Sequence, residues 1–288
     1  MKTLVFLLVW AGCVAAHAAP LTITGDDGAT LSLDAAPQRI ISLAPNLTEL
    51  AYAAGLGSRM VAVTAYSDYP DAARKLPLVG DVFHLDWERI VALKPDLVLA
   101  WASSFPAADR ARFAQMKLKA LVLEPRRLDD IPRALRLLGQ AGDATAQAEA
   151  AARSFERHRE ALRDRYASRP TVRVWFQIAA DPLLTVNGDH IVSDVLRLCG
   201  AENVFADAPL LTPAISEEAL VQARPQLLLG DADTPELQKD MLAHWRRLPL
   251  AAAREGRMAF IPPDLISRAS PRILQGAERI CGEVERVR

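Results

Sequence analysis

The three cysteines of this 288-residue chain, Cys13, Cys199 and Cys281, carry the redox chemistry that its sequence offers. Two thiols that meet in an oxidising compartment form a disulfide, whereas thiols in a reducing cytosol stay free. Spacing along the chain does not show that two cysteines meet, because a disulfide needs their Cα atoms within about 7 Å. We expect a disulfide between Cys199 and Cys281 if the chain is exported, with two buried free thiols as the alternative.

The first residues indicate the compartment. Lys2 precedes an apolar stretch over residues 4–14, and small residues follow it. This order is typical of a secretory signal peptide and predicts that residues 1–18 are removed. The apolar stretch is shorter than the roughly 20 residues of a transmembrane helix. Cleavage would also remove Cys13, although residues 11–13 have the small-small-Cys arrangement of a lipid-attachment site, which stays open as an alternative.

Catalytic signatures are absent from the sequence. No glycine-rich phosphate loop follows a strand pattern, and neither a Gly-x-Ser-x-Gly elbow nor a His-Glu-x-x-His motif occurs. We therefore predict no enzyme, no cofactor and no metal site, with a secreted hydrolase assembled from distant residues as a remote alternative. The histidines beyond the signal stand singly, without ligand spacing: His84, His158, His190 and His244.

Composition narrows the class of protein further. The 34 basic and 35 acidic residues nearly cancel, so the chain lacks the positive field that holds a nucleic acid. A hydrophobic fraction of 51% is enough to bury a large core and excludes a disordered chain. The length fits one large domain or two lobes of ordinary size.

The hydrophobic pattern of the first half predicts strands that alternate with helices. Residues 21–33 alternate apolar and polar side chains around a Gly-Asp-Asp-Gly turn, which predicts a β-hairpin. Asn46 and Glu49 have the spacing of a capping box, which predicts a helix over residues 46–54. Repeated strand–helix units indicate a parallel sheet covered by helices. The predicted strands are residues 39–43, 60–64, 96–101 and 120–123.

The middle of the chain has the pattern of one long helix. Over residues 143–166, Ala148, Phe155, Tyr166 and other apolar residues recur at helical spacing, enough for a helix of about 36 Å. Because strand–helix alternation restarts afterwards, we interpret this helix as a connection between two lobes, with a surface helix of a single domain as the alternative. The later strands are predicted at residues 172–178, 183–186, 227–230 and 258–261, and the later helices at residues 190–198, 216–223, 235–245 and 271–284.

An internal repeat supports the two-lobed interpretation. Residues 88–99 align with residues 218–229 in a glutamate, an apolar pair, a basic residue, a proline and an apolar triplet. Each copy predicts a helix that ends before proline and then a buried strand. Structural duplication would put Glu88 and Glu218 in equivalent places, one per lobe. Chance similarity between two helix-Pro-strand units is the alternative.

Several longer motifs identify a family. Residues 39–50, 66–70 (Tyr-Ser-Asp-Tyr-Pro) and 88–98 resemble the helix-linked (class III) substrate-binding proteins of bacterial ABC importers, in particular those for vitamin B12, or cobalamin. The match continues in residues 198–205 and in residues 268–273 (Arg-Ala-Ser-Pro-Arg-Ile), and it covers nearly the whole chain after the signal. The Tyr-Ser-Asp-Tyr-Pro and Arg-Ala-Ser-Pro-Arg segments narrow the resemblance towards cobalamin.

This resemblance implies a fold and a location. The expected fold is α/β, with two Rossmann-like lobes that contain central parallel sheets, a single long α-helix joining them, and the ligand in the interlobe cleft. The implied boundaries are residues 19–142 for the N-terminal lobe, residues 143–168 for the connecting helix and residues 169–288 for the C-terminal lobe. The protein would work in the periplasm and would be a monomer when free.

The resemblance also implies partners and a covalent link. It places a disulfide at Cys199 and Cys281, and it assigns Glu88 and Glu218 to docking on an inner-membrane permease dimer that works with ATPase subunits. One carboxylate on each lobe can meet an arginine on each permease copy. Charge pairs at a solvated interface set its register and its rate of encounter more than its affinity.

The implied ligand is cobalamin, carried as transported cargo rather than as a cofactor. Between Asp264 and Arg268, where the family has two aromatic side chains, residues 265–267 read Leu-Ile-Ser. Part of the stacking surface is therefore missing, and a related corrinoid fits the prediction as well as cobalamin. The expected ligand-binding residues are Tyr66, Phe83, Trp101, Asp264, Leu265, Ile266, Ser267 and Arg268.

A ferric siderophore or haem-binding protein of the same fold is the alternative within this class. Haem would favour an axial Tyr or His in the cleft. Anionic siderophores would favour several converging arginines, of which the sequence offers Arg268. His84 and Thr212 lie close to the expected site in the sequence, but no role is assigned to them.

Overall fold

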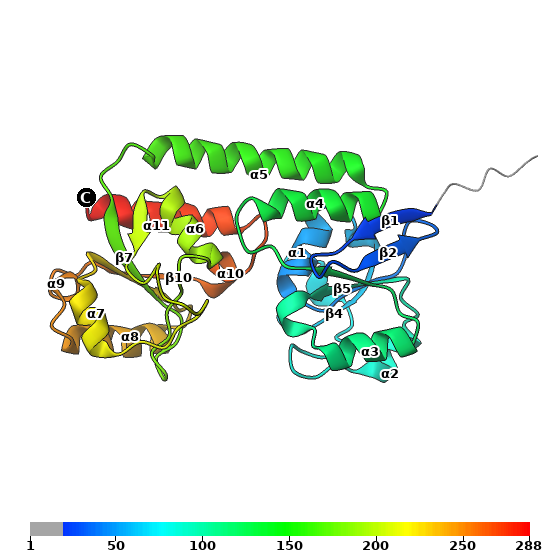
Figure 1. Cartoon of the computed structure of the whole chain (residues 1–288), viewed down its shortest axis with the longest axis horizontal. Coiled ribbons are helices and arrows are strands. Elements are labelled where there is room, and N and C mark those ends of the chain that lie inside the picture. The colour runs from blue at the N-terminus through cyan, green and yellow to red at the C-terminus, as the bar shows by residue number, and fades with distance from the viewer. Residues whose placement is uncertain (1–19) are drawn as a thin grey trace, which may run out of the picture.

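The computed structural model describes residues 20–288, so the predicted signal peptide and Cys13 lie outside the described residues. Figure 1 shows two α/β lobes that are bridged along one edge by the long helix α5 (Thr145–Tyr166). Within residues 20–288, no helix has the length and apolar character needed to cross a membrane. The predicted fold class, two lobes with parallel sheets joined by one helix, is confirmed.

The N-terminal lobe is built on a parallel sheet with the order β4-β3-β5-β6, and the predicted hairpin is confirmed as the antiparallel pair β1 and β2. Strand β5 is a continuous apolar run, as expected for a parallel strand with helices on both faces. The strands are β1 (Leu21–Thr24), β2 (Thr30–Leu33), β3 (Ile40–Ser42), β4 (Met60–Val63), β5 (Leu97–Trp101) and β6 (Ala120–Leu123). The helices are α1 (Pro45–Ala53), α2 (Trp87–Ala92), α3 (Ala107–Gln115) and α4 (Asp130–Ala141), with 3₁₀ turns η1 (Gly57–Arg59), η2 (Ala73–Lys75) and η3 (Ala102–Ser104).

The C-terminal lobe repeats the same strand order, β8-β7-β9-β10, again with parallel pairing. The strand predicted at residues 183–186 is wrong, because Leu184 forms isolated bridges to Ala179 and Ala214 instead of joining the sheet. The strands are β7 (Val172–Gln177), β8 (Ala201–Asn203), β9 (Leu227–Asp231) and β10 (Met258–Ile261). The helices are α6 (Ile191–Leu198), α7 (Glu217–Ala223), α8 (Pro235–Arg247), α9 (Ala251–Arg254), α10 (Pro263–Ile266) and α11 (Ile273–Arg286).

The internal repeat has a backbone counterpart in both lobes. Asp86 caps α2 by accepting a hydrogen bond from Arg89 N, and Ser216 caps α7 by accepting one from Ala219 N. After each helix the chain turns through a left-handed residue, Lys94 with φ 46° and Arg224 with φ 45°, and proline follows each of them. The predicted duplication is therefore confirmed.

The duplication extends to the first strand of each sheet. Arg39 N donates to Asp96 Oδ1 at 2.9 Å in the N-terminal lobe, and Arg173 N donates to Gln226 Oε1 at 2.9 Å in the C-terminal lobe. Both arginine side chains then reach a carbonyl at the C-terminal end of α2 or α7. Each arginine thus ties the first strand of its lobe to the repeated helix.

Helix α5 packs into both lobes along one apolar face. Ala148, Ala152, Phe155, Leu162 and Tyr166 are buried on that face. They belong to one hydrophobic cluster that includes core residues of both lobes, so the core continues from one lobe to the other beneath the helix. A helix held by two cores resists bending at its middle.

The predicted disulfide is confirmed. Cys199, at the end of α6, is bonded to Cys281 in α11, and their Cα atoms are 4.7 Å apart. Both residues are fully buried, and α11 also packs on α5. The alternative of two free thiols is wrong.

Candidate ligand-binding site

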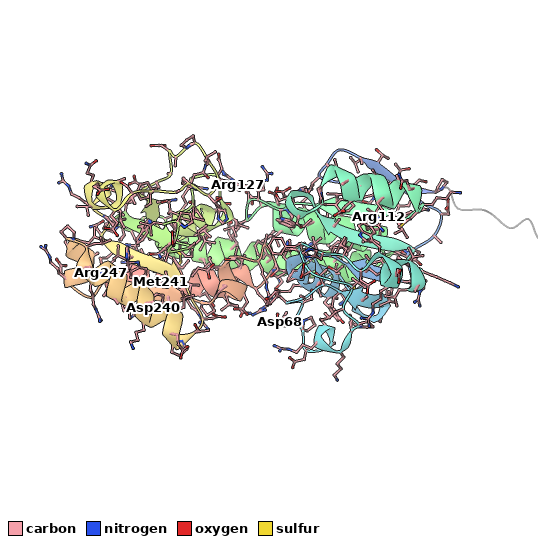
Figure 2. All side chains as sticks on the ribbon, turned by 90° about the horizontal axis from the view of Figure 1, so that it is seen from below. Asp68, Arg112, Arg127, Asp240, Met241 and Arg247 are labelled. Atoms are coloured by element: carbon pink, nitrogen blue, oxygen red, sulfur yellow. A yellow bond between two sulfur atoms is a disulfide. The ribbon has the colours of Figure 1, made fainter. Side chains whose placement is uncertain are left out.

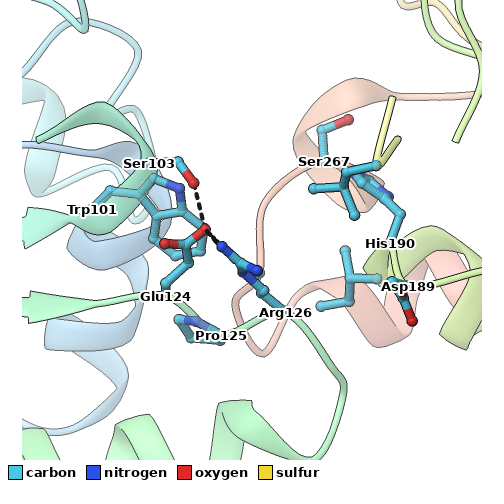
Figure 3. A pocket seen from close by; sticks show the side chains of 11 residues that line it. Trp101, Ser103, Glu124, Pro125, Arg126, Asp189, His190 and Ser267 are labelled. Carbon is cyan, nitrogen blue, oxygen red and sulfur yellow. Dashed lines mark hydrogen bonds and ion pairs between the residues drawn. The ribbon is translucent and has the colours of Figure 1, made fainter. Parts of the chain in front are cut away.

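A cavity of about 210 Å³ lies between the two lobes (Figure 3). On the N-terminal side it is lined by Trp101, the last residue of β5, and by Glu124, which directly follows β6. Ser267, in the loop after α10, lines the C-terminal side. Ligands of parallel α/β sheets bind outside the carboxyl ends of the strands, which is where this cavity lies.

The N-terminal wall combines an indole with a closed polar network. Ser103 Oγ donates to Glu124 Oε1, and Arg126 Nε and Nη2 donate to the same oxygen at 3.1 and 2.9 Å. Figure 3 shows this network beside the Trp101 ring. Arg126 therefore presents a charge that is already paired within the wall.

A second hollow continues the N-terminal wall and includes Phe83 and Trp101. Phe83 lies in a loop that Asp81 holds in place, because Asp81 Oδ1 accepts from the backbone N–H groups of Phe83 and His84 at 2.8 Å each. The Phe83 residue is 84% exposed, which is unusual for a large apolar side chain. A rigid loop thus presents an apolar ring to solvent beside Trp101.

The C-terminal wall has polar groups of its own. Ser267 Oγ donates to Asp231 Oδ2 at 2.7 Å, and Asp231 is the last residue of β9. Burial raises the pKa of Asp231 to about 6, although the hydrogen bond from Ser267 opposes this shift, and the charge of Asp233 adds to it. His190 lines the same wall, and burial lowers its pKa to about 4, so its ring is neutral near pH 7.

A cluster of charged side chains, Glu49, Asp68, Arg268 and Arg272, joins the two lobes beside the cavity. We call it the interlobe ion cluster. Glu49 Oε1 accepts from Nη1 of Arg268 at 3.0 Å and from Nη1 of Arg272 at 3.1 Å. Ser270 Oγ donates to the other Glu49 oxygen at 2.5 Å, and the Glu49 side chain is only 2% exposed. A buried carboxylate of the N-terminal lobe thus accepts three hydrogen bonds from the C-terminal lobe.

Arg268 also fixes the loop that carries Tyr66. Its guanidinium donates to Asp68 Oδ1 at 2.6 Å and to the carbonyl of Tyr66 at 3.0 Å. Burial alone would raise the pKa of Asp68, but the hydrogen bond and charge of Arg268 outweigh burial and lower that pKa. Tyr66 adopts a left-handed backbone with φ 65° and is 81% exposed. Arg268 therefore holds an exposed tyrosine in a conformation that non-glycine residues seldom adopt.

The capping box predicted at Asn46 and Glu49 is wrong. Helix α1 begins one residue earlier, with Pro45 in its first turn, and Ala44 caps it without a side-chain hydrogen bond. Glu49 cannot reach back to the helix start because its carboxylate is engaged by the interlobe ion cluster.

The predicted ligand segment after β10 divides into buried and accessible parts. Leu265 and Ile266 are 5% and 0% exposed, so their side chains belong to the core rather than to the cavity. Asp264 pairs with Arg272, whose guanidinium also lies over the Tyr69 ring. Of this segment, Ser267 lines the cavity, and Arg268 reaches across the lobes.

Among residues 20–288, no group of three or more His, Cys, Asp or Glu side chains is arranged to hold a metal ion.

A family model described as periplasmic binding protein matches residues 40–265, which include both sheets and the connecting helix. The chain belongs to the periplasmic binding protein family. Both lobes of this binding protein thus contribute to the family match, and so do the cavity residues up to Leu211.

The similar proteins include several that are named for a ligand. The chain is 38% identical over 252 residues to the vitamin B12-binding protein of Yersinia pestis (strain Pestoides F), covering 86% of this chain and 87% of that one. The crystal structure of the periplasmic vitamin B12 binding protein BtuF of Vibrio cholerae is 32% identical, with a TM-score of 0.79 over 87% of this chain and 98% of that one. A periplasmic heme binding protein from Pseudomonas aeruginosa is 25% identical, with a TM-score of 0.78 over 86% of this chain and 92% of that one.

The two glutamates of the repeat do not line the cleft cavity of this binding protein. Glu88 is in the first turn of α2 and Glu218 is in the first turn of α7, and both are exposed. Hydrogen bonds from its own backbone and from Ser216 lower the pKa of Glu218. Figure 1 shows α2 and α7 on the edge of the molecule opposite α5, one on each lobe.

Sequence reasoning missed several side chains of the cleft and of the interlobe ion cluster. The spacing of Glu49 predicts a helix cap, and Asp231 lies one residue beyond the strand predicted at residues 227–230. The repeat contained a signal for Asp231. When the two copies are extended by two residues, Asp231 aligns with Trp101 at the end of the strand. His190, Glu124 and Arg126 carried no such signal.

Proposed function

We propose that this periplasmic binding protein captures cobalamin or a related corrinoid and delivers it to an ABC transporter of the inner membrane. Relatives named for vitamin B12 match the chain over most of its length at 38% and 32% identity. Residues 1–18 would be the removed signal, and residues 19–142, 143–168 and 169–288 the N-terminal lobe, connecting helix and C-terminal lobe.

The pairing of the cleft cations is the observation that carries this proposal. Of the described residues that line the cavity, Arg126 and His190 are the basic ones. Arg126 is paired with Glu124, and His190 is neutral near pH 7. Arg268 is likewise paired with Glu49 and Asp68. A ligand with carboxylates, such as haem or many siderophores, would find no free cation here, whereas a ring system with neutral amide arms needs none.

The apolar surface of the cleft fits the same kind of ligand. Phe83 and Trp101 present aromatic rings on the N-terminal side, and Leu211 lines the cavity from the C-terminal side while it remains 41% exposed. A corrin ring has a wide apolar perimeter that such side chains can cover. We assign the side chains of Tyr66, Phe83, Trp101, Ser267 and Arg268 to the ligand site. Asp264, Leu265 and Ile266 would contact the ligand through their backbone or would position the neighbouring residues that do.

Delivery would use Glu88 and Glu218. Both carboxylates are exposed at the starts of equivalent helices on the edge opposite α5, so each can meet an arginine of one permease copy.

Calorimetric titration of the purified chain without residues 1–18 tests the proposal. We expect saturable binding of cyanocobalamin or cobinamide, and little or no binding of haem or of a ferric hydroxamate siderophore. Saturable binding of haem or siderophore without binding of either corrinoid would overturn the proposed function.

A further inference from the structure

The C-terminal wall of the cavity holds a hydrogen-bond donor and a hydrogen-bond acceptor whose directions are fixed by the protein. Ser267 is exposed and lines the cavity, and its hydroxyl proton is committed to Asp231 Oδ2 at 2.7 Å. A hydroxyl carries one proton and two lone pairs, so the Ser267 oxygen is left as an acceptor towards a ligand. Asp231 thereby fixes the polarity of a group that could otherwise donate or accept.

His190, on the same wall, has the opposite polarity. Val192 N donates to His190 Nδ1 at 3.2 Å, and a backbone N–H can only donate, so Nδ1 carries no proton. Because the ring is neutral near pH 7, its single proton is on Nε2. Both residues line the cavity (Figure 3), so the donor that His190 has left for a ligand is Nε2–H and the acceptor that Ser267 has left is its oxygen.

We propose that His190 and Ser267 bind one primary carboxamide of the ligand, and that Asp231 is the positioning residue that makes the site select a carboxamide over a carboxylate. The amide oxygen accepts from His190 Nε2–H, and the amide N–H donates to Ser267 Oγ. A carboxylate in the same place has no hydrogen to give Ser267 and would face the lone pairs of its oxygen and the charge of Asp231. This inference rests on the proposed function, since corrinoids carry several carboxamides on the ring perimeter.

Equivalent positions in the two lobes support the assignment. Trp101 ends β5 and Asp231 ends β9, and these strands begin within the two copies of the repeat. The N-terminal lobe therefore puts an apolar ring at the place where the C-terminal lobe puts a carboxylate. The ligand would therefore meet an aromatic ring at the end of one strand and an oriented polar pair beside the end of the other.

The experiment uses cyanocobalamin and the cyanocobalamin monocarboxylates, in each of which one peripheral carboxamide is hydrolysed, titrated at about pH 7.5 where Asp231 is ionised. The wild-type protein should bind at least one monocarboxylate at least ~10-fold more weakly than cyanocobalamin, which is about 1.4 kcal/mol. Asp231→Asn, which keeps the shape but lets the Ser267 proton turn to the ligand, should reduce this ratio to within about threefold. Ser267→Ala should reduce it in the same way.

Two further variants separate the roles. His190→Ala should weaken cyanocobalamin and the monocarboxylate by about the same factor, roughly 10-fold, and leave their ratio intact, because both ligands offer an oxygen to Nε2–H. Asp240→Asn, a matched substitution on the exposed face of α8, should change neither affinity nor ratio.

Equal affinity of the wild-type protein for cyanocobalamin and every monocarboxylate would overturn the inference, as would an unchanged ratio in both Asp231→Asn and Ser267→Ala. In either case binding of cyanocobalamin itself would leave the proposed function standing. Failure to bind any corrinoid would instead overturn the proposed function and this inference together.

Discussion

The two lobes share one strand order and differ in the side chain that ends the third strand beside the cleft. Both have the strand order second, first, third, fourth, and both fasten the repeated helix to the first strand with an arginine, Arg39 or Arg173. The third strand then ends in Trp101 in one lobe and in Asp231 in the other. The positions inside each lobe keep their hydrogen-bond roles, whereas the residue at the end of the third strand, beside the cavity, differs in its chemistry.

The lobes also differ in how they are stapled. The C-terminal lobe carries the Cys199–Cys281 disulfide, and the N-terminal lobe carries the β1–β2 hairpin, where the backbone of Asp26 bonds to Val122. The interlobe ion cluster then joins the lobes at Glu49. The two lobes therefore share one topology but are stabilised by different local features.

The largest expected effect is on uptake, and it comes from Glu88 and Glu218, which occupy equivalent positions in the two lobes. Glu88→Ala combined with Glu218→Ala should abolish cobalamin uptake by cells, because each lobe loses the carboxylate that we propose for docking on the permease. Calorimetry should show unchanged cobalamin affinity, since neither residue lines the cavity. The two single variants compare the lobes directly. Normal uptake by the double variant would sink the docking role.

Removal of Glu49 should break the connection between the lobes. Glu49→Ala leaves the guanidinium groups of Arg268 and Arg272 without their shared buried carboxylate, and loss of one partner from a buried ion pair typically costs about 3–5 kcal/mol. Urea denaturation measures the change in the free energy of unfolding. Glu88→Ala, an exposed substitution of the same type, is the control and should change it by less than about 0.5 kcal/mol. Equal stability of the two variants would show that the cluster does not hold the lobes.

The disulfide tests whether the C-terminal lobe depends on its staple. Cys199→Ala with Cys281→Ala should lower the free energy of unfolding by about 2–5 kcal/mol, because the closed loop spans 82 residues. Hydrogen exchange should report the loss in α6 and α11 and leave β3 and β5 of the N-terminal lobe protected. Uniform loss of protection in both lobes would contradict this assignment.

The smallest effect concerns the strand ends. Asp231 has a pKa of about 6 when folded, above its usual 3.8, so the folded protein holds a proton that the unfolded chain releases. This contribution to stability is present at low pH and is lost as the pH rises from about 4 to about 6. Asp231→Asn should therefore raise the Tm at about pH 7.5, and the gain should vanish near pH 4.

His190 should shift stability in the opposite sense within the same wall. Its pKa falls from 6.5 to about 4 on folding, so its contribution to stability is lost as the pH falls from about 6.5 to about 4. Thermal scans of His190→Ala and Asp231→Asn against pH should therefore give difference curves of opposite slope. Asp240→Asn supplies the flat reference, and a flat curve for Asp231→Asn would contradict its raised pKa.

Much of the fold could be predicted because buried parallel strands and amphipathic helices leave strong periodic patterns. Strands β6 and β10 and the long helix α5 were predicted within two residues of their bounds at each end, and the repeat revealed the duplicated helix and strand. Strand β8 was missed because three residues, Ala-Glu-Asn, are too few to show alternation. The strand predicted at residues 183–186 has apolar residues, but its backbone bonds go to a loop instead of a sheet.

The cleft was less predictable, because its contacts join residues that are far apart in the sequence. Glu49 and Arg272 are separated by 223 residues, so no local pattern links them. The local spacing of Asn46 and Glu49 favoured a helix cap, but a buried carboxylate takes the partners that neutralise it, and those come from the other lobe. The polarity of Ser267 depends in the same way on Asp231, 36 residues earlier.

Helix α5 sets the span of the molecule. Its 22 residues rise about 33 Å, and its buried face is shared by both cores. Helices α2 and α7 lie on the edge opposite α5, one on each lobe, and Figure 2 shows the same two lobes end to end from below. Because α5 is packed into both cores, it opposes a change in the distance between α2 and α7 when the cleft is filled. If a transporter binds both helices, as we propose, it would recognise the loaded protein by contact with the ligand and not by a change in the distance between α2 and α7.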